Sequence, residues 1–339
     1  MTRTLTALLG TTIFMSTALA AQAQELNLYS SRHYETDERL YSDFTELTGI
    51  TINRIEGNAD ELIARMDAEG ENSPADVFLT VDTSRLQRAA DMGVLQPIES
   101  DVLAERIPAN LRDDDNLWFG FSQRARIIFY DTERVENPPQ TYLELADPAY
   151  EGLVCIRSST NTYNQTLLAS IIENHGEEAA REWANGVVAN MARDPQGGDT
   201  DQLRGLVSGE CGISVSNTYY MARAIRRDVE GLSEEDRANI GWVFPDQGGN
   251  GAHVNLSGGG VAANAPHLDA AIAFMEYLAS DQAQEYFSAG NDEYPVVEGV
   301  AIAPSAQELG AFEADDVSLA AVAGNLPLAQ QIFNEAGWE

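Results

Sequence analysis

Strand-like and helix-like patterns alternate along most of this 339-residue chain, and this alternation limits the folds that it can adopt. Strands are predicted at residues 25–31, 51–56, 76–81, 127–130, 153–158, 212–216 and 241–244. Helices, in which apolar residues recur every three or four positions, are predicted at 36–48, around 62–66, and at 84–92, 161–174, 177–189, 267–279 and 281–289. Strands that alternate with helices in this way are typical of α/β architecture.

Two such series can be separated, one that begins near residue 25 and one that begins near residue 127. A chain of this length can form two lobes with separate cores. We predict that residues 24–122 and 254–339 form lobe one and that residues 123–253 form lobe two, so that the chain crosses between the lobes more than once. A ligand in such a protein lies between the lobes, at the carboxyl ends of the strands.

A glycine-rich stretch runs from Gly248 to Gly260. It has neither the lysine nor the following helix of a phosphate-binding loop. Glycine clusters are typical of turns, so a flexible turn that enters a return strand is the expected structure here.

The first 23 residues have the features of a signal peptide. A positive start that includes Arg3 precedes an apolar stretch at 5–19, and small residues up to Ala23 provide cleavage sites. No later stretch approaches the roughly 18 apolar residues that a spanning helix needs, so no membrane insertion is expected. We predict that the mature chain is exported and soluble in the periplasm.

The two cysteines, Cys155 and Cys211, each lie in or beside a predicted strand of lobe two. In an oxidising compartment such a pair is expected to form a disulfide. A pair of free, buried thiols is the alternative.

The charge of the chain excludes several classes of function. The formal net charge is −34, and all 20 basic residues are arginine. The absence of lysine excludes a lysine Schiff base and a P-loop lysine. So acidic a surface also argues against binding to nucleic acid and is better explained as adaptation to a salty exterior.

Four tyrosines occupy junctions where a predicted strand leads into a predicted helix. Tyr219 and Tyr220 are adjacent at one junction, Tyr163 lies at a second, and Tyr34 follows the first strand. Helix N-termini favour negative charge, although a phenol alone titrates only at about pH 10. Phenolate oxygen is a hard ligand, so a hard cation, above all Fe³⁺, is the expected partner. The alternative is that these tyrosines are ordinary core and surface aromatics.

The predicted lobes place Tyr34 on one side of the cleft and the other three tyrosines on the other side, so a metal would be held across it. His33 is a further candidate ligand, although a lone histidine is more often structural, as we expect for His253. Four phenolates would leave an Fe³⁺ site with excess negative charge, which an arginine could offset. The candidates are Arg124, which we place first, and Arg126, Arg157 and Arg223.

Several segments together resemble one known family over nearly the whole mature chain. The matching segments include His33-Tyr34, Asn217-Thr218-Tyr219-Tyr220 and the stretches 27–37, 74–78, 124–130, 157–165, 253–258 and 291–296. The chain resembles the periplasmic ferric-iron-binding proteins of bacterial ABC importers, in the branch with a histidine and several tyrosine ligands. Each segment alone would be a weak signal, but their combination is specific.

The resemblance implies the type II periplasmic binding protein fold, with two α/β lobes that close on the metal by a hinge motion. It implies that Tyr34, Tyr163, Tyr219 and Tyr220 bind Fe³⁺, and that His33 does so in some members. Arg124 matches an arginine that contacts a synergistic anion, such as carbonate, or the surroundings of the metal. The implied protein is a monomer that performs no chemistry and delivers iron to an inner-membrane ABC permease. Binding of Fe²⁺ stays open if the histidine takes part.

Two other functions remain as alternatives. The tyrosines could serve a binding protein for another small solute, such as an oxyanion, a polyamine or a sugar. A metalloenzyme is less well supported, because the chain has neither an H-E-x-x-H nor a G-x-S-x-G motif.

Overall fold

The computed structural model of the chain describes residues 24–32, 34 and 36–339. The predicted signal peptide and His33 therefore lie outside the described residues. Across the described part of the chain, no helix is both long and apolar enough to cross a membrane.

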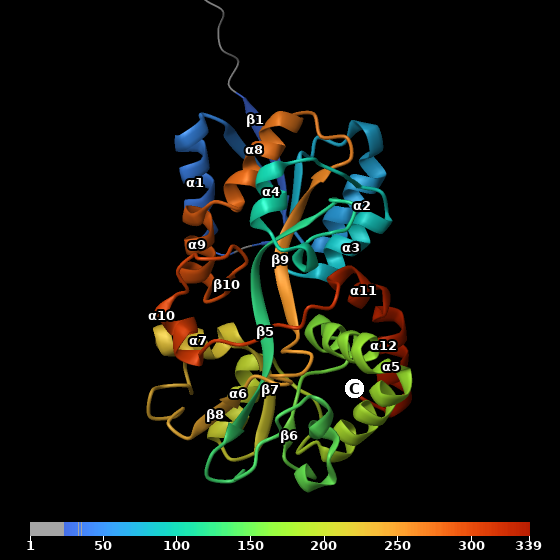
Figure 1. Cartoon of the computed structure of the whole chain (residues 1–339), viewed down its shortest axis with the longest axis vertical. Helices are drawn as coiled ribbons and strands as arrows, with labels where there is room; N and C mark the ends of the chain where they lie inside the picture. Colours follow the sequence, from blue (N-terminus) through green and yellow to red (C-terminus); the bar gives the residue numbers. More distant parts are fainter. Residues whose placement is uncertain (1–23, 33, 35) are drawn as a thin grey trace, which may run out of the picture.

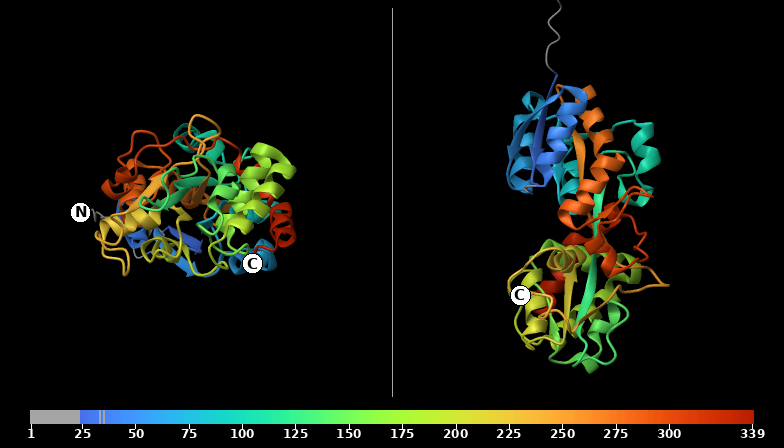
Figure 2. Two further views of the ribbon diagram at one scale, coloured as in Figure 1. Left: turned by 90° about the horizontal axis from the view of Figure 1, so that it is seen from below. Right: turned by 90° about the vertical axis from the view of Figure 1, so that its left-hand side faces the viewer.

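Two lobes lie one above the other and are joined mainly by two long strands, β5 (Phe119–Asp131) and β9 (Val254–Ala262) (Figures 1 and 2). The strands of the described residues follow one path through both lobes, in the order β2-β1-β3-β9-β5-β7-β6. The mixed α/β architecture predicted from the sequence is therefore present.

Lobe one, drawn at the top of Figure 1, contains a parallel group formed by β1 (Glu25–Ser30), β2 (Thr51–Glu56) and β3 (Val77–Thr80). The four residues of β3 are all buried, as expected for a strand that is covered on both faces. Its helices are α1 (Asp37–Thr48), α2 (Ala59–Glu69), α3 (Thr83–Asp91), α4 (Asp101–Arg106), α8 (Leu268–Leu278) and α9 (Asp281–Asn291). Two short strands, β4 (Leu95–Gln96) and β10 (Tyr294–Pro295), pair with β9 and β5.

Lobe two is built around the second half of β5, which pairs with β7 (Ile213–Asn217) and β8 (Ile240–Val243). Only Val154–Cys155 of the predicted strand 153–158 pairs in the sheet, as β6 beside β7. Its helices are α5 (Thr162–Asn190), α6 (Asp199–Val207) and α7 (Thr218–Arg226). The two helices predicted at 161–174 and 177–189 are both present, and they are joined at Gly176, which has a φ of 84°.

The predicted disulfide between Cys155 and Cys211 is present. It joins β6 to the residues just ahead of β7. These two strands precede α5 and α7, whose first turns carry three of the tyrosines. The disulfide therefore links the chain segments that lead into those turns.

The predicted turn lies at residues 245–250 and leads into the predicted return strand, β9, which contains the three glycines at 258–260. A Cβ atom added to Gly258 would lie 2.4 Å from the carbonyl oxygen of Phe119, and one on Gly259 would lie 2.7 Å from that of Phe78. Glycine is thus required because the neighbouring backbones approach too closely for a side chain.

Three C-terminal helices pack against helices of lobe two. They are α11 (Leu319–Gly324) and α12 (Leu326–Ala336), which pack against α5, and α10 (Pro304–Leu309), which packs against α7. Trp338 stacks near Trp183 of α5, with ring centroids 5.7 Å apart. The sequence prediction gave all of residues 254–339 to lobe one. These contacts lead us to propose that residues 315–339 belong with lobe two.

Candidate metal centre

Each tyrosine of the predicted site lies where a strand ends and a helix begins. Tyr219 and Tyr220 are in the first turn of α7, directly after β7. Tyr163 is in the first turn of α5, where the side chain of Asn161 accepts a hydrogen bond of 3.1 Å from its backbone N–H. Tyr34 lies between β1 and α1. Three of the four side chains therefore come from lobe two and one from lobe one, as predicted.

The three tyrosines of lobe two meet. The hydroxyl oxygens of Tyr163 and Tyr219 are 3.1 Å apart. The rings of Tyr219 and Tyr220 are stacked, with centroids 4.3 Å apart and an interplanar angle of 29°. Tyr34 lies close enough to Tyr163 and Tyr219 to interact with both electrostatically. The structure thus brings Tyr163, Tyr219 and Tyr220 into contact and places Tyr34 in their electrostatic neighbourhood.

Burial raises the pKa of three of these phenols, those of Tyr34, Tyr219 and Tyr220. It is the main cause that raises the pKa of Tyr219 well above its usual value, and the neighbouring phenols add to the effect. Burial also raises the pKa of Tyr220 and that of Tyr34 to about 12, helped by Asp199 and Glu293 respectively. Desolvation therefore outweighs the stabilisation that helix N-termini offer to a phenolate. A cation that binds here has to displace the protons.

Arginine side chains surround the tyrosine cluster. The guanidinium carbon atoms of Arg124, Arg126 and Arg157 lie 5.8, 5.9 and 5.3 Å from the centroid of the Tyr163 ring. That of Arg223 lies 5.3 Å from the centroid of the Tyr219 ring. All four arginines predicted to balance the charge of a metal site are therefore beside it.

Arg124 is buried, and its side chain is fixed by contacts with residues of lobe one. Its Nη2 donates to the carbonyl oxygen of Val81, and its Nη1 donates to Ser257 Oγ at 3.4 Å and lies 3.9 Å from Glu293 Oε1. Glu293 also accepts a hydrogen bond from Ser122. These contacts fix the guanidinium beside Tyr163, at the junction of the two lobes.

Two buried carboxylates beside the site were not predicted from the sequence. Glu293 and Asp199 are 3% and 0% exposed, and each raises the pKa of a site tyrosine. Glu293 lies in the matching segment 291–296, which could have indicated it. Asp199 lies in no motif, so only the three-dimensional structure reveals its position.

The other donor types that bind metals contribute no centre. Among the described residues, no group of three or more His, Cys, Asp or Glu side chains lies together as a metal site. His253, predicted to be structural, is buried, and its Nε2 lies 3.3 Å from Thr166 Oγ1.

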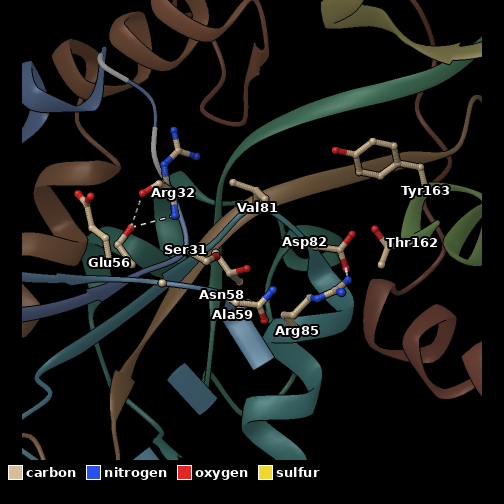
Figure 3. A pocket seen from close by; sticks show the side chains of 13 residues that line it. Ser31, Arg32, Glu56, Asn58, Ala59, Val81, Asp82, Arg85, Thr162 and Tyr163 are labelled. Atoms are coloured by element: carbon tan, nitrogen blue, oxygen red, sulfur yellow. Dashed lines mark hydrogen bonds and ion pairs between the residues drawn. The ribbon is translucent and has the colours of Figure 1, made fainter. Parts of the chain in front are cut away.

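A cavity of about 620 Å³ lies beside the tyrosines and is lined by both lobes. Figure 3 shows Tyr163 extending into it from lobe two, opposite Arg32, Val81 and Asp82 of lobe one. The lining residues also include Ser31, Asn58, Arg85 and Thr162. Arg32 is fixed by Asp37, which accepts two hydrogen bonds of 2.9 Å from it.

Two α/β lobes that share two strands and together line one cavity define a substrate-binding protein that holds its ligand between the lobes. The chain belongs to the bacterial extracellular solute-binding protein family, whose sequence pattern matches residues 72–314. The resemblance found in the sequence is confirmed, and the fold is the type II periplasmic binding protein fold.

Several relatives are named for iron. The chain is 48% identical over 319 residues to Iron uptake protein A1 of Synechocystis sp., which covers 94% of this chain and 88% of the relative. It is 27% identical to the Fe(3+)-binding periplasmic protein of Serratia marcescens, over 95% of this chain and 94% of the relative. Among solved structures, Trichodesmium IdiA (FutA), in complex with iron and citrate ligands, has a TM-score of 0.89 and 48% identity, covering 93% of this chain and all of the other. The ferric binding protein from Campylobacter jejuni has a TM-score of 0.84 and 39% identity, with the same two coverages.

Proposed function

We propose that this protein captures ferric iron between its lobes through Tyr34, Tyr163, Tyr219 and Tyr220 and delivers it to an ABC permease. The observation that carries the proposal is the meeting of phenol oxygens from two separate helices, those of Tyr163 and Tyr219, at 3.1 Å. Buried hydroxyl groups usually pair with backbone or water rather than gather in one place. The similarity to relatives named for iron uptake and ferric iron binding supports the same assignment.

The chemistry of the site suits a small cation of high charge. Phenolate oxygens are hard ligands, and Fe³⁺ can displace phenol protons even where burial raises the pKa. Binding therefore releases protons, and acid favours release of the metal. Four phenolates exceed the charge of Fe³⁺ by one, and the surrounding arginines offset this excess.

An anion completes the site in this proposal. Arg124 keeps its charge at any relevant pH and can bind a carboxylate or carbonate through paired N–H groups. The Trichodesmium protein is in complex with both iron and citrate, which supports an anion of this kind. His33 stays a predicted further ligand, and with it the capacity to hold Fe²⁺.

In the proposed function the protein is a carrier and not an enzyme. It binds iron in the periplasm as a monomer, closes by rotation of the lobes, and releases the metal at the permease. An N-terminal signal peptide would direct it there.

Addition of Fe³⁺ to the purified protein tests the proposal directly. We expect an intense visible band from phenolate-to-iron charge transfer, which the Tyr219→Phe/Tyr220→Phe variant loses. Tyr150→Phe is the matched control, because its hydroxyl donates to the carbonyl oxygen of Asn137, outside the tyrosine cluster. A wild-type protein that stays colourless with Fe³⁺ and binds an organic solute tightly would refute the assignment.

A second variant tests the part given to Arg124. Arg124→Ala should weaken iron binding and change its dependence on carbonate or citrate, since the anion loses its partner. Unchanged affinity, anion dependence and spectrum would show that the arginine has no such part.

A further inference from the structure

A buried aspartate lies between the two helices that carry the tyrosines of lobe two. Asp199 is the first residue of α6 and is completely buried. Its Oδ2 accepts a hydrogen bond of 3.0 Å from the backbone N–H of Asn217, two residues ahead of Tyr219. The same oxygen lies 3.2 Å from Arg126 Nη1, and Oδ1 lies 3.7 Å from Arg157 Nη1.

Arg126 extends this contact to the second helix. Its Nη2 donates to Asn164 Oδ1 at 2.7 Å, and Asn164 directly follows Tyr163. Asn164 in turn donates through Nδ2 to the carbonyl oxygens of Arg157, at 2.7 Å, and Ser158, at 3.2 Å. Asp199 and Arg126 therefore bind, directly or through one asparagine, both segments on which the tyrosines are mounted.

The orientation of Asn217 shows that this network determines local structure. Asn217 precedes the first turn of α7, where asparagine usually caps the helix with its side chain. Here the side chain caps nothing, and its Oδ1 accepts from Arg126 Nη1 at 3.2 Å instead. At the start of α5, by contrast, Asn161 caps the helix in the usual way. At the start of α7, Asn217 therefore uses its side chain to bind Arg126 instead of capping the helix.

A buried ion pair of this kind is weak evidence for stability. Removal of two charges from water costs free energy that their attraction often only offsets, and apolar residues of similar volume do as well or better. Partners outside the coordination sphere, however, orient the groups that bind a metal. The position of Asp199 and Arg126 between the two tyrosine-bearing helices suits that purpose.

We propose that Asp199 is a positioning residue for the iron site, which acts with Arg126 to hold the starts of α5 and α7 so that Tyr163 and Tyr219 meet. This inference rests on the proposed function. Asp199 does not touch the metal. It sets the distance and angle between two of the phenol oxygens that bind it.

The test compares Asp199→Asn with Asp201→Asn. The first variant keeps the shape of the side chain and one acceptor oxygen but loses the charge that pairs with Arg126. Asp201 is the matched control, because it lies in the same helical turn and accepts hydrogen bonds from the backbone N–H of Gly198 and from Arg204 Nη1 rather than from the partners of Asp199. Iron affinity is measured by competition with a ferric chelator, the energy of the visible iron–phenolate band by absorbance, and folding by thermal melting.

For Asp199→Asn we expect a shifted visible band and an iron affinity about 10- to 100-fold weaker, the usual effect of losing such a partner. Asp201→Asn should leave band and affinity as in the wild type. Arg126→Lys serves as a second variant, since it keeps both charges but cannot donate to Asp199, Asn164 and Asn217 together. It should shift the band as well, and it decides the question by the same measurements if Asp199→Asn does not fold.

A folded Asp199→Asn protein with a lower melting temperature but unchanged band and affinity would overturn the inference, because its role would then be structural only. So would a wild-type band in Arg126→Lys when Asp199→Asn fails to fold. A wild-type protein that shows no band with Fe³⁺ at all is a different result, which refutes the proposed function itself.

Discussion

The two lobes contribute to the site in different ways. Lobe two supplies Tyr163, Tyr219 and Tyr220 from the first turns of two helices, which a disulfide and a buried ion pair hold together. Lobe one supplies Tyr34 from a segment between β1 and α1 that belongs to no helix or strand. On the proposed function, we expect lobe two to form most of the binding surface and lobe one to complete it when the lobes close.

Two arginines on β5 show the same division at close range. Arg124 and Arg126 are two residues apart, so they lie on the same face of the strand. Arg124 contacts Val81 and Glu293 of lobe one, whereas Arg126 contacts Asp199 of lobe two. Two arginines on one face of β5 are thus held by different lobes, and both lie near the ring of Tyr163.

The largest effect is expected from the removal of phenol oxygens in lobe two. The Tyr219→Phe/Tyr220→Phe variant keeps the stacked rings but loses two ligands, so iron affinity should fall by more than the roughly 100-fold that loss of an outer partner costs. Competition with a ferric chelator measures it. If Tyr34→Phe lowered iron affinity more than this double variant does, lobe one and not lobe two would contribute most to iron binding.

Removal of the disulfide, which lies in lobe two, should lower the free energy of unfolding. The bond closes a sequence separation of 56 residues within lobe two. Cys155→Ser/Cys211→Ser should lower the free energy of unfolding by about 4 kcal/mol in the chain-entropy model. Denaturant unfolding measures the change, and reduction of the wild type should reproduce it. An unchanged unfolding curve would show that the segments ahead of α5 and α7 need no covalent tie.

Acid should destabilise the contact that His253 makes with α5. Burial, followed by the nearby charges of Arg126 and Arg124, lowers the pKa of His253 to about 3. Between pH 6.5 and 3 the unfolded chain therefore binds a proton that the folded chain does not, and stability falls as the pH falls. The loss from this residue is about 2 kcal/mol at pH 5, at about 1.4 kcal/mol per pH unit.

His253→Gln should flatten the decline in unfolding free energy between pH 6.5 and 5. His175→Gln is the control, since that residue is exposed and its Nε2 lies 3.3 Å from Asn250 Nδ2. Equal pH dependence in His253→Gln and the wild type would contradict the prediction.

The smallest effect is expected from lobe one. Tyr34→Phe leaves three phenolates in place, so the visible band should persist and the affinity should fall by about tenfold, or ~1.4 kcal/mol. The loss should appear mainly as faster release of iron, because lobe one closes over a metal that lobe two already holds. Stopped-flow transfer to a chelator measures that rate. A complete loss of the band would mean that the lobes share the metal equally.

The sequence predicted the elements that repeat a regular pattern. Leu40, Phe44 and Leu47 predict the apolar face of α1, and the first two are buried, whereas Leu47 near the end of the helix is 66% exposed. Gly49 ends that helix with a φ of 75°, as expected for a left-handed cap. The tyrosine junctions were also predictable, because a strand pattern, a phenol and a helix pattern follow one another at each site. Local patterns of this kind carry their own signal.

Other features depend on contacts between distant segments and could not be predicted. The need for glycine at 258–260 could not be predicted, because nothing in the sequence shows how closely the backbones of Phe119 and Phe78 approach these residues. The packing of α12 on α5 joins segments more than 130 residues apart. Asp199 likewise has no motif around it, since its partners Asn217 and Arg126 come from other parts of the chain.

Strands β5 and β9 both pass through the junction of the lobes, and this affects how a receptor could distinguish the iron-bound protein from the iron-free protein. The two strands are hydrogen-bonded to each other from Phe119 to Ala125 and from Val254 to Gly259. Because this ladder joins the lobes, we expect their relative motion to consist mainly of bending and twisting of β5 and β9. Loaded and unloaded molecules would then differ in little more than one angle. A receptor that grips both lobes at once could read that angle without touching the iron.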